Sequence, residues 1–220
     1  MTKLVTIFGG SGFIGRYVAR RMAKEGWRVR VAVRRPNEAL FVKPYGVVGQ
    51  VEPILCNIRN DASVDAALAG ADAVVNCVGI LANDGKNTFE SVQTEGAARI
   101  ARLAAARGIE RMVHVSAIGA DPDSDSAYAR TKAEGEAGLC RAFPDATILR
   151  PSIVFGAGDG FFNRFAGMAM TAPALPVIGG GTNRIQPVYV GDVANAVVNA
   201  LKDDRTAGKV YELGGPRVMS

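Results

Sequence analysis

The sequence of 220 residues predicts an α/β fold, a doubly wound parallel sheet covered by helices on both faces and extended by a small C-terminal lobe. Three observations predict it. Short apolar runs rich in Val and Ile alternate with longer segments whose apolar residues recur at helical spacing. A glycine-rich turn joins the first such run to the first helical segment. The apolar fraction of 48% and the charged fraction of 21% are typical of a soluble globular domain.

The strands of the first two-thirds are compact apolar runs bounded by turn residues. They are predicted at residues 4–8, 28–33, 50–56, 73–78, 111–117 and 146–150. Pro53 interrupts the third run. Helices are predicted at residues 12–25, 61–68, 89–107 and 127–141, with Gly26 and Gly108 ending the first and the third. The alternation predicts parallel strands joined by helical crossovers.

The pattern changes after Arg150. Residues 151–186 contain Pro, Gly and aromatic residues with weak periodicity, residues 188–201 resemble a strand that turns into a helix, and residues 209–215 a last strand. No repeat or linker divides the chain, so we expect one domain over residues 1–220. Segments 151–186 and 202–220 are expected to contribute to a small lobe that faces a substrate or a partner. Because another helix would be expected after Leu213, we expect the C-terminus to be truncated.

The charge pattern limits the partners. The net charge is +5, but Lys and Arg are dispersed, which permits anionic partners such as a dinucleotide, an acidic protein surface or a membrane surface. Aromatic residues do not interleave with the basic ones, so we expect no nucleic acid. No run of 18 apolar residues and no signal peptide is visible, so we expect no transmembrane segment and a cytoplasmic location.

The cysteines and the single histidine do not have metal-ligand spacing, and we expect no metal. Cys56 and Cys77 lie in strand-like runs, where a thiol is usually a small buried hydrophobe. His114 lies in a central strand and is expected to be a satisfied core or interface histidine. The acidic run 121–126 lacks the Gly and the terminal Glu of an EF-hand loop, and we expect a solvated loop.

The glycine-rich turn has the pattern of a phosphate-binding loop. Gly9, Gly12 and Gly15 follow the first strand and open the first helix. Such glycines allow a sharp turn, a close approach of the backbone to a pyrophosphate, and tight helix–sheet packing, and the helix N-terminus offers free N–H groups. The sequence therefore predicts a Rossmann fold that binds a dinucleotide, with contacts from Gly9, Ser11, Gly12, Phe13 and Ile14.

The end of the second strand favours NADPH or NADP over NADH or NAD. An acid that would hold the ribose 2′-hydroxyl is expected about 20 residues after the glycines. Arg34 and Arg35 stand there instead, and the next acid is Glu38. A guanidinium pairs with a 2′-phosphate, which a carboxylate would repel. Arg16 could add to this positive pocket. The alternative is that Arg34 and Arg35 are solvated loop charges.

The ends of two further strands lie where the cofactor would pass. Asn57 and Ile58 end the third strand and are expected beside the adenine. Val78 and Gly79 end the fourth, where Gly79 would let the cofactor approach the backbone. Each residue taken singly is equally compatible with a structural role.

Three polar residues have a spacing suited to acid–base chemistry. Ser116 ends the fifth strand, and Tyr128 and Lys132 lie four residues apart at the start of the next helix. Residues at this spacing share a helix face, so the Lys132 ammonium can lie near the phenol and is expected to lower its pKa. The alternative is that Tyr128 packs in the interior and Lys132 is exposed.

The glycine turn, Ser116 and the Tyr-x-x-x-Lys pair resemble the short-chain dehydrogenase/reductase superfamily. The stretches ILRPSIVFG (148–156), QPVYVGDVANAV (186–197) and YELGG (211–215) resemble its extended and atypical branches. The resemblance implies that Tyr128 is the acid/base, that Lys132 also contacts the nicotinamide ribose, and that a small C-terminal lobe covers the nicotinamide end. We include Pro151 and Ile153, from the first stretch, among the expected cofactor contacts.

A closer resemblance is carried by HVSAIGADPDSDSAYARTKAEGE (114–136), FFNRF (161–165) and the QPV stretch (186–188). These are similar to the alpha-subcomplex subunit 9 family of nucleotide-binding accessory subunits of respiratory complex I. The resemblance implies tightly held, structural NADPH and partners among the subunits of a membrane-associated respiratory complex. It implies a peripheral place on the cytoplasmic face of the inner membrane, or the matrix side in a eukaryote. Gln93 stands where many active relatives have an Asn that organises a proton-relay water.

Three hypotheses follow. The chain is an NADPH-binding subunit without turnover, or a freestanding NADPH-dependent reductase, epimerase or dehydratase acting on a small carbonyl or nucleotide-sugar substrate through Tyr128 and Lys132. The third is a regulator that senses NADP(H). The apolar segment 161–176 would be a docking surface in the first case and a substrate pocket in the second. It is equally compatible with the core of the small lobe.

Overall fold

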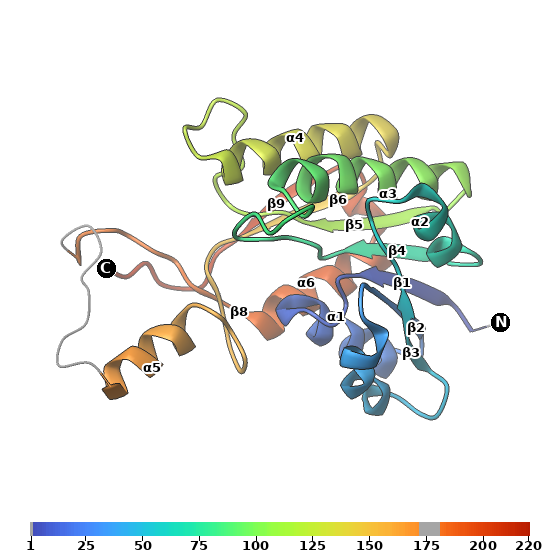
Figure 1. The fold of residues 1–220 in the computed structure, drawn as a ribbon, viewed down its shortest axis with the longest axis horizontal. Helices are drawn as coiled ribbons and strands as arrows, with labels where there is room; N and C mark the ends of the chain where they lie inside the picture. Colours follow the sequence, from blue (N-terminus) through green and yellow to red (C-terminus); the bar gives the residue numbers. More distant parts are fainter. Residues whose placement is uncertain (1, 172–180) are drawn as a thin grey trace.

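The computed structural model describes residues 2–171 and 181–220, and its centre is a seven-stranded parallel sheet (Figure 1). The sheet order is β3-β2-β1-β4-β5-β6-β9. Its strands are β1 (Leu4–Phe8), β2 (Arg28–Val33), β3 (Val51–Leu55), β4 (Ala73–Asn76), β5 (Arg111–Val115), β6 (Thr147–Pro151) and β9 (Val210–Leu213). The predicted doubly wound sheet is confirmed.

Helices cover both faces of the sheet (Figure 1). One face carries α1 (Phe13–Lys24) and α6 (Val190–Lys202), and the other carries α2 (Asp61–Leu68), α3 (Glu95–Ala106) and α4 (Ala127–Ala142). Alternate strand residues enter the two cores: Val5 and Ile7 pack on the α1–α6 side, whereas Phe8 packs on the α3 side. Because both faces are buried, the strands are nearly continuous apolar runs.

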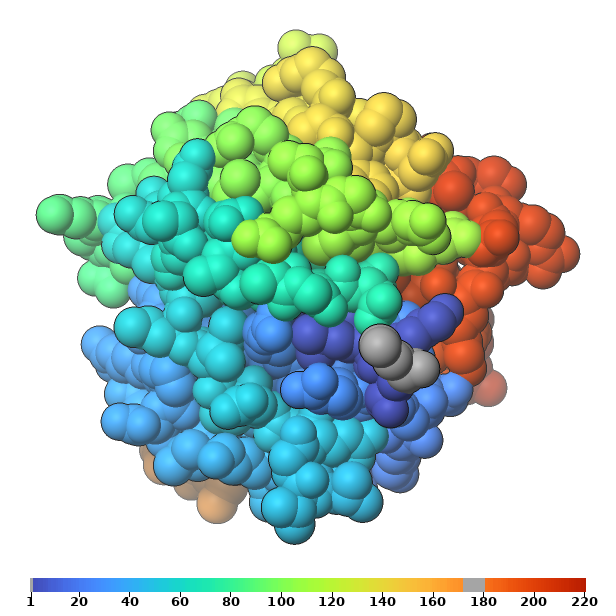
Figure 2. Space-filling view, turned by 90° about the vertical axis from the view of Figure 1, so that its right-hand side faces the viewer, coloured from blue at the N-terminus to red at the C-terminus, as the bar shows by residue number. Residues whose placement is uncertain are grey.

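The sheet reverses its strand order at β1, which pairs with β2 on one side and β4 on the other. The connections leave in opposite directions there, which opens a crevice beyond the carboxyl ends of the strands, the usual ligand site in such sheets. The end of the molecule near the N-terminus is rounded and formed mostly by the first 150 residues, with the C-terminal region at one side (Figure 2).

Three segments differ from the sequence prediction. β3 runs unbroken through Pro53, because β3 is an edge strand, where the missing N–H of a proline is tolerated. A 3₁₀ helix, η1 (Pro36–Tyr45), follows β2 and was not predicted. The predicted helix 89–107 consists of a π-helical turn, η2 (Glu90–Thr94), followed by α3.

The C-terminal third mixes main-sheet and peripheral elements. The predicted strand-to-helix segment is confirmed as β8 (Val188–Tyr189) and α6, and β8 pairs in parallel with β7 (Val154–Phe155). α5 (Phe162–Thr171) projects from the body and has no buried residue (Figure 1). A short 3₁₀ turn, η4 (Asp204–Thr206), leads to β9, which joins the main sheet beside β6. The part of segment 161–176 beyond residue 171 lies outside the described residues.

Candidate functional site

A cleft of about 230 Å³ lies at the carboxyl ends of β1 to β4. Its lining includes eight residues that the sequence predicted as cofactor contacts: Gly9, Ser11, Gly12, Arg34, Asn57, Ile58, Val78 and Gly79. Arg59 and Asn87 also line it, and the sequence reasoning missed both. Arg59 directly follows Ile58 in the loop after β3, and this position next to a predicted contact is the sequence signal that indicates it.

The glycine turn leaves room at the floor of the cleft. Gly9 has φ +74°, and a Cβ on Gly15 would lie 2.2 Å from the Gly9 carbonyl oxygen, so only glycine fits at position 15. Gly12 is the N-cap residue of α1, so the helix has no side-chain cap, and its first turn has no acid. Phe13 and Ile14 open the helix, whose first N–H groups therefore have no capping oxygen. This turn fits a pyrophosphate.

The two arginines after β2 have different surroundings. Arg35 Nη1 lies 3.1 Å from Glu38 Oε1 in an exposed ion pair, and Arg35 does not line the cleft. Arg34 lines the cleft and has no side-chain partner among the described residues. Arg34 and Arg59 are therefore the two arginines of the cleft lining, and of these Arg59 donates to the Lys86 carbonyl at 3.4 Å.

Arg16 does not join this positive group. Its Nη2 donates to the Ala157 carbonyl at 2.9 Å, and its guanidinium lies 5.7 Å from the centre of the Phe13 ring. The expectation that Arg16 adds to the pocket at Arg34 is not met, because the Arg16 guanidinium is hydrogen-bonded to the loop after β7.

Ser116 and the Lys132 amine both lie next to Val115, outside the lining of the cleft. Ser116 follows β5, and its buried Oγ has no hydrogen-bond partner among the described residues. Lys132, on α4, is 4% exposed, and its Nζ donates to the Val115 carbonyl at 3.4 Å. A Cβ on Gly79 would lie 3.4 Å from Lys132 Nζ, so the amine lies beside the cleft. The alternative that Lys132 is exposed is wrong.

Tyr128 lies one helical turn before Lys132, with the Lys132 Nζ 6.0 Å from the centre of its ring. Burial raises the pKa of Tyr128, contrary to the expected lowering, because desolvation disfavours the charged phenolate. Phe89 packs edge-on against the Tyr128 ring at 6.0 Å between centroids. Burial also lowers the pKa of Lys132 to about 8, against the opposing effect of Glu136. The Tyr128 ring and an amine of lowered basicity therefore lie close together, and the amine contacts the carbonyl of the residue before Ser116.

Gln93 is buried in η2 behind this group. Its Nε2 donates to Thr131 Oγ1 at 3.4 Å, while its Oε1 is buried without a partner among the described residues. The side chain therefore packs toward α4 and keeps one free acceptor.

His114 is 2% exposed, as expected for a core histidine. Asn76 Nδ2 donates to its Nδ1 at 3.1 Å, and Asn76 Oδ1 accepts from the Val78 amide at 3.0 Å. Burial, and next the charge of Lys132, lowers the pKa of His114 to about 3. A neutral imidazole is thus tied, through Asn76, to the turn that bears Val78 and Gly79.

Several predicted site residues do not line this cleft: Phe13, Ile14, Ser116, Tyr128, Lys132, Pro151 and Ile153. Pro151 ends β6, and its carbonyl accepts from the Ile118 amide at 3.0 Å, whereas Ile153 bonds to the Val188 amide. Pro151 is the last residue of β6 and Ile153 follows it, and β6 is next to β5, so both lie on the side of Ser116 rather than of Arg34. Beyond them, Phe155, Phe161, Phe162, Phe165 and Tyr189 form a chain of ring contacts at the base of α5. Among the residues with described side chains, no cluster suited to a metal ion occurs.

The family model of the NAD dependent epimerase/dehydratase family matches residues 5–214. The chain belongs to this family. A solved structure of a putative NAD-dependent epimerase/dehydratase from Bacillus halodurans has the same fold, with a TM-score of 0.74, 22% identity, and coverage of 97% of this chain and 94% of that one.

Two relatives have more specific names. The chain is 40% identical to NADH dehydrogenase (ubiquinone) 1 alpha subcomplex subunit 9, mitochondrial, of Arabidopsis thaliana, over 99% of this chain and 55% of the relative. It is 33% identical to the ceramide reductase of Caulobacter vibrioides, over 89% of this chain and 60% of the relative. The family member described here thus spans little more than half the length of either. None of its described helices is both long enough and apolar enough to cross a membrane.

Proposed function

We propose that this chain binds NADP(H) as a mainly structural cofactor and serves as an accessory subunit of respiratory NADH:quinone oxidoreductase. The observation that carries the cofactor choice is Arg34, a cleft-lining guanidinium without a side-chain partner among the described residues. An unpaired guanidinium beside a phosphate-binding turn suits a 2′-phosphate. The relative from Arabidopsis thaliana, named as a complex I subunit, supports the assembly.

Different residues of the cleft would contact different parts of the cofactor. Gly9, Ser11 and Gly12 would hold the pyrophosphate together with the first amides of α1, at Phe13 and Ile14. Asn57 and Ile58 would contact the adenine, and Val78 and Gly79 the middle of the cofactor.

Tyr128 and Lys132 would contact the nicotinamide ribose, and Pro151 and Ile153 would flank the nicotinamide end. When bound, the cofactor would supply or accept a hydride. Because Arg35 is paired with Glu38, its contribution to the 2′-phosphate would be smaller than that of Arg34.

The partners would be subunits of a membrane-associated complex, with the chain peripheral on the cytoplasmic face of the inner membrane, or on the matrix side in a eukaryote. α5 is the element that favours docking, because it projects from the body without a buried residue (Figure 1). Large hydrophobic side chains on such an element are typical of an interaction surface, and Met170 is 87% exposed.

A second candidate is an NADPH-dependent reductase, epimerase or dehydratase. It is favoured by the unpartnered Ser116 Oγ, which suits the binding of a carbonyl or hydroxyl oxygen, and by the buried Lys132 amine at the carbonyl of the preceding residue, Val115. One protein of similar sequence, from Caulobacter vibrioides, has the name of an enzyme, ceramide reductase, which supports this candidate. In this case the substrate would approach Ser116 and Tyr128.

Purification and kinetics distinguish the two. If the cofactor is structural, NADPH should survive purification and exchange slowly, and a panel of carbonyl substrates should cause no oxidation of the NADPH. Steady saturable turnover that Tyr128→Phe abolishes without weakening NADPH binding would favour the enzyme. Copurification of membrane respiratory subunits in mild detergent would support the assembly, and their absence would count against it.

A further inference from the structure

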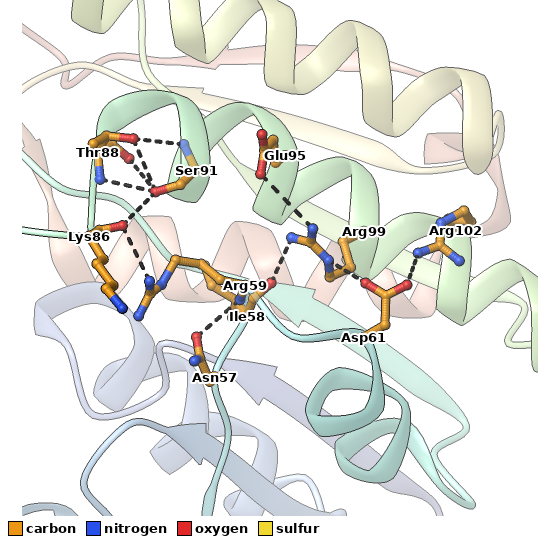
Figure 3. Close-up of polar contacts among 10 residues, drawn as sticks. All are labelled: Asn57, Ile58, Arg59, Asp61, Lys86, Thr88, Ser91, Glu95, Arg99 and Arg102. Atoms are coloured by element: carbon orange, nitrogen blue, oxygen red, sulfur yellow. Dashed lines mark hydrogen bonds and ion pairs between the residues drawn. The ribbon is translucent and has the colours of Figure 1, made fainter.

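Arg99 holds the loop that follows β3 from outside the cleft (Figure 3). It lies on α3 with a side chain that is 18% exposed. Its Nη1 donates to the Ile58 carbonyl at 3.0 Å, and its Nε lies 2.5 Å from Asp61 Oδ1. Arg99 is absent from the cleft lining, whereas Ile58 is part of it. One planar guanidinium therefore joins a cleft residue to the first residue of α2.

Asp61 is itself fixed on both oxygens. Oδ1 accepts from Arg99, and Oδ2 accepts from Arg102 Nη2 at 2.5 Å. These hydrogen bonds lower the pKa of Asp61, the one from Arg102 having the largest effect. The carboxylate thus stays charged at neutral pH and keeps the Arg99 guanidinium in the orientation that reaches Ile58.

Among the described residues, the hydrogen bonds of this loop leave one amide of a cleft-lining residue without a partner. The amide of Asn57 donates to Ser63 Oγ at 2.9 Å, and that of Arg59 donates to Asn57 Oδ1 at 3.1 Å. The amide of Asn60 donates to the Asn57 carbonyl. Within the described residues, the amide of Ile58 has no acceptor, so it remains available to a ligand.

The Ile58 side chain is fitted to α3 as well. A Cβ on Gly96 would lie 2.9 Å from Ile58 Cδ1, so the glycine makes room for it. Ile58 is therefore held at its side chain by the surface of α3 and at its carbonyl by Arg99. Both contacts come from the same helix, which sets the position of the free amide.

We propose that Arg99 is a positioning residue for the adenosine half of the cofactor. It acts through Ile58 and makes no contact with the ligand itself. The proposal rests on dinucleotide binding in the cleft. Without Arg99, the Ile58 carbonyl loses its partner, the loop between β3 and α2 gains conformations, and ligand binding must restrict them again. A lysine does not replace it, because one ammonium lacks the planar fork that spans carbonyl and carboxylate.

Arg107 provides a matched control. It follows α3 and binds Asp65 on α2 through Nε at 2.6 Å and Nη2 at 2.7 Å. This bridge joins the same two helices without touching the loop at residues 57–60. Arg107→Ala therefore removes an equivalent ion pair and keeps the hydrogen bond from Arg99 to the Ile58 carbonyl.

Calorimetric titration with NADPH, with 2′,5′-ADP and with reduced nicotinamide mononucleotide tests the proposal. Arg99→Ala and Arg99→Lys should weaken NADPH and 2′,5′-ADP about tenfold, since a hydrogen bond to a charged donor is lost, and leave the mononucleotide unchanged. Arg107→Ala should keep all three within about twofold of wild type.

Equal effects of Arg99→Ala and Arg107→Ala would overturn the proposal, as would equal weakening of the mononucleotide. Failure of the wild-type protein to bind NADPH would instead overturn the proposed function, together with the inference that rests on it.

Discussion

Arg35 is paired with Glu38, Nη1 to Oε1 at 3.1 Å, so the two arginines that follow β2 are not equivalent. Of these two arginines, Arg34 lines the cleft and Arg35 does not. In the sequence, Arg34 and Arg35 look like a pair of anion ligands. In the fold, Arg34 lines the cleft and Arg35 belongs to a surface ion pair.

The first prediction separates these arginines. Arg34→Ala should weaken NADPH by about 1.5–3 kcal/mol relative to NADH, because a charged hydrogen bond to the 2′-phosphate is lost. Arg35→Ala, the matched control, should change the NADPH affinity by less than about 1 kcal/mol, since exposed ion pairs contribute little. Dissociation constants for both nucleotides provide the measurement. Equal weakening of NADPH and NADH by Arg34→Ala would contradict the assignment of the 2′-phosphate.

The second prediction concerns Gly15. Gly15→Ala should abolish dinucleotide binding and destabilise the fold by about 1–3 kcal/mol, because the new Cβ would meet the Gly9 carbonyl oxygen at 2.2 Å. Gly160→Ala is the control, since a Cβ there meets nothing within 4 Å. Thermal unfolding and NADPH titration measure both effects. Wild-type NADPH affinity of Gly15→Ala would contradict the prediction, because it would mean that the close contact between Gly15 and the Gly9 carbonyl is not needed for binding.

The third prediction follows from Lys132, whose pKa is lowered from 10.5 to about 8 by burial. Between pH 8 and 10.5 the unfolded chain holds a proton that the folded chain has lost, so stability from this group rises with pH. At pH 7 the buried ammonium therefore costs on the order of 3 kcal/mol. Lys132→Met should stabilise the ligand-free protein at pH 7 and remove that rise. Urea unfolding of both proteins across this range is the measurement, and an identical rise in the variant would contradict it.

The fourth prediction uses the single histidine of the chain. Because the pKa of His114 is lowered to about 3, its imidazole resonances should show no titration between pH 5 and 8. Between pH 6.5 and 3, His114 binds a proton in the unfolded chain but stays neutral in the folded chain. The free energy of unfolding therefore falls as the pH falls. His114→Gln, which keeps an acceptor for Asn76, should reduce this loss. A histidine resonance that titrates near pH 6.5 would refute the prediction.

Much of the fold was predictable because its signals are local. Apolar runs and helical spacing located the strands and helices of the main sheet, and the glycine turn located the crevice. The break expected at Pro53 was wrong, because whether a proline interrupts a strand depends on whether that strand is at an edge. The turn η2 and the β7–β8 pair were not predicted, since packing and pairing between distant segments produce them.

The sequence by itself determined which chemical groups follow the strands of the sheet: the glycine turn after β1, an arginine after β2, a serine after β5, and a tyrosine and a lysine on α4. The tertiary structure decided which of these groups are free. Arg16 bonds to Ala157, far along the chain, and Arg99 on α3 bonds to Ile58. Burial, rather than the i,i+4 spacing, set the direction of the Tyr128 pKa shift. Spacing places groups on a common face, but partners and desolvation depend on what other elements bring to that face.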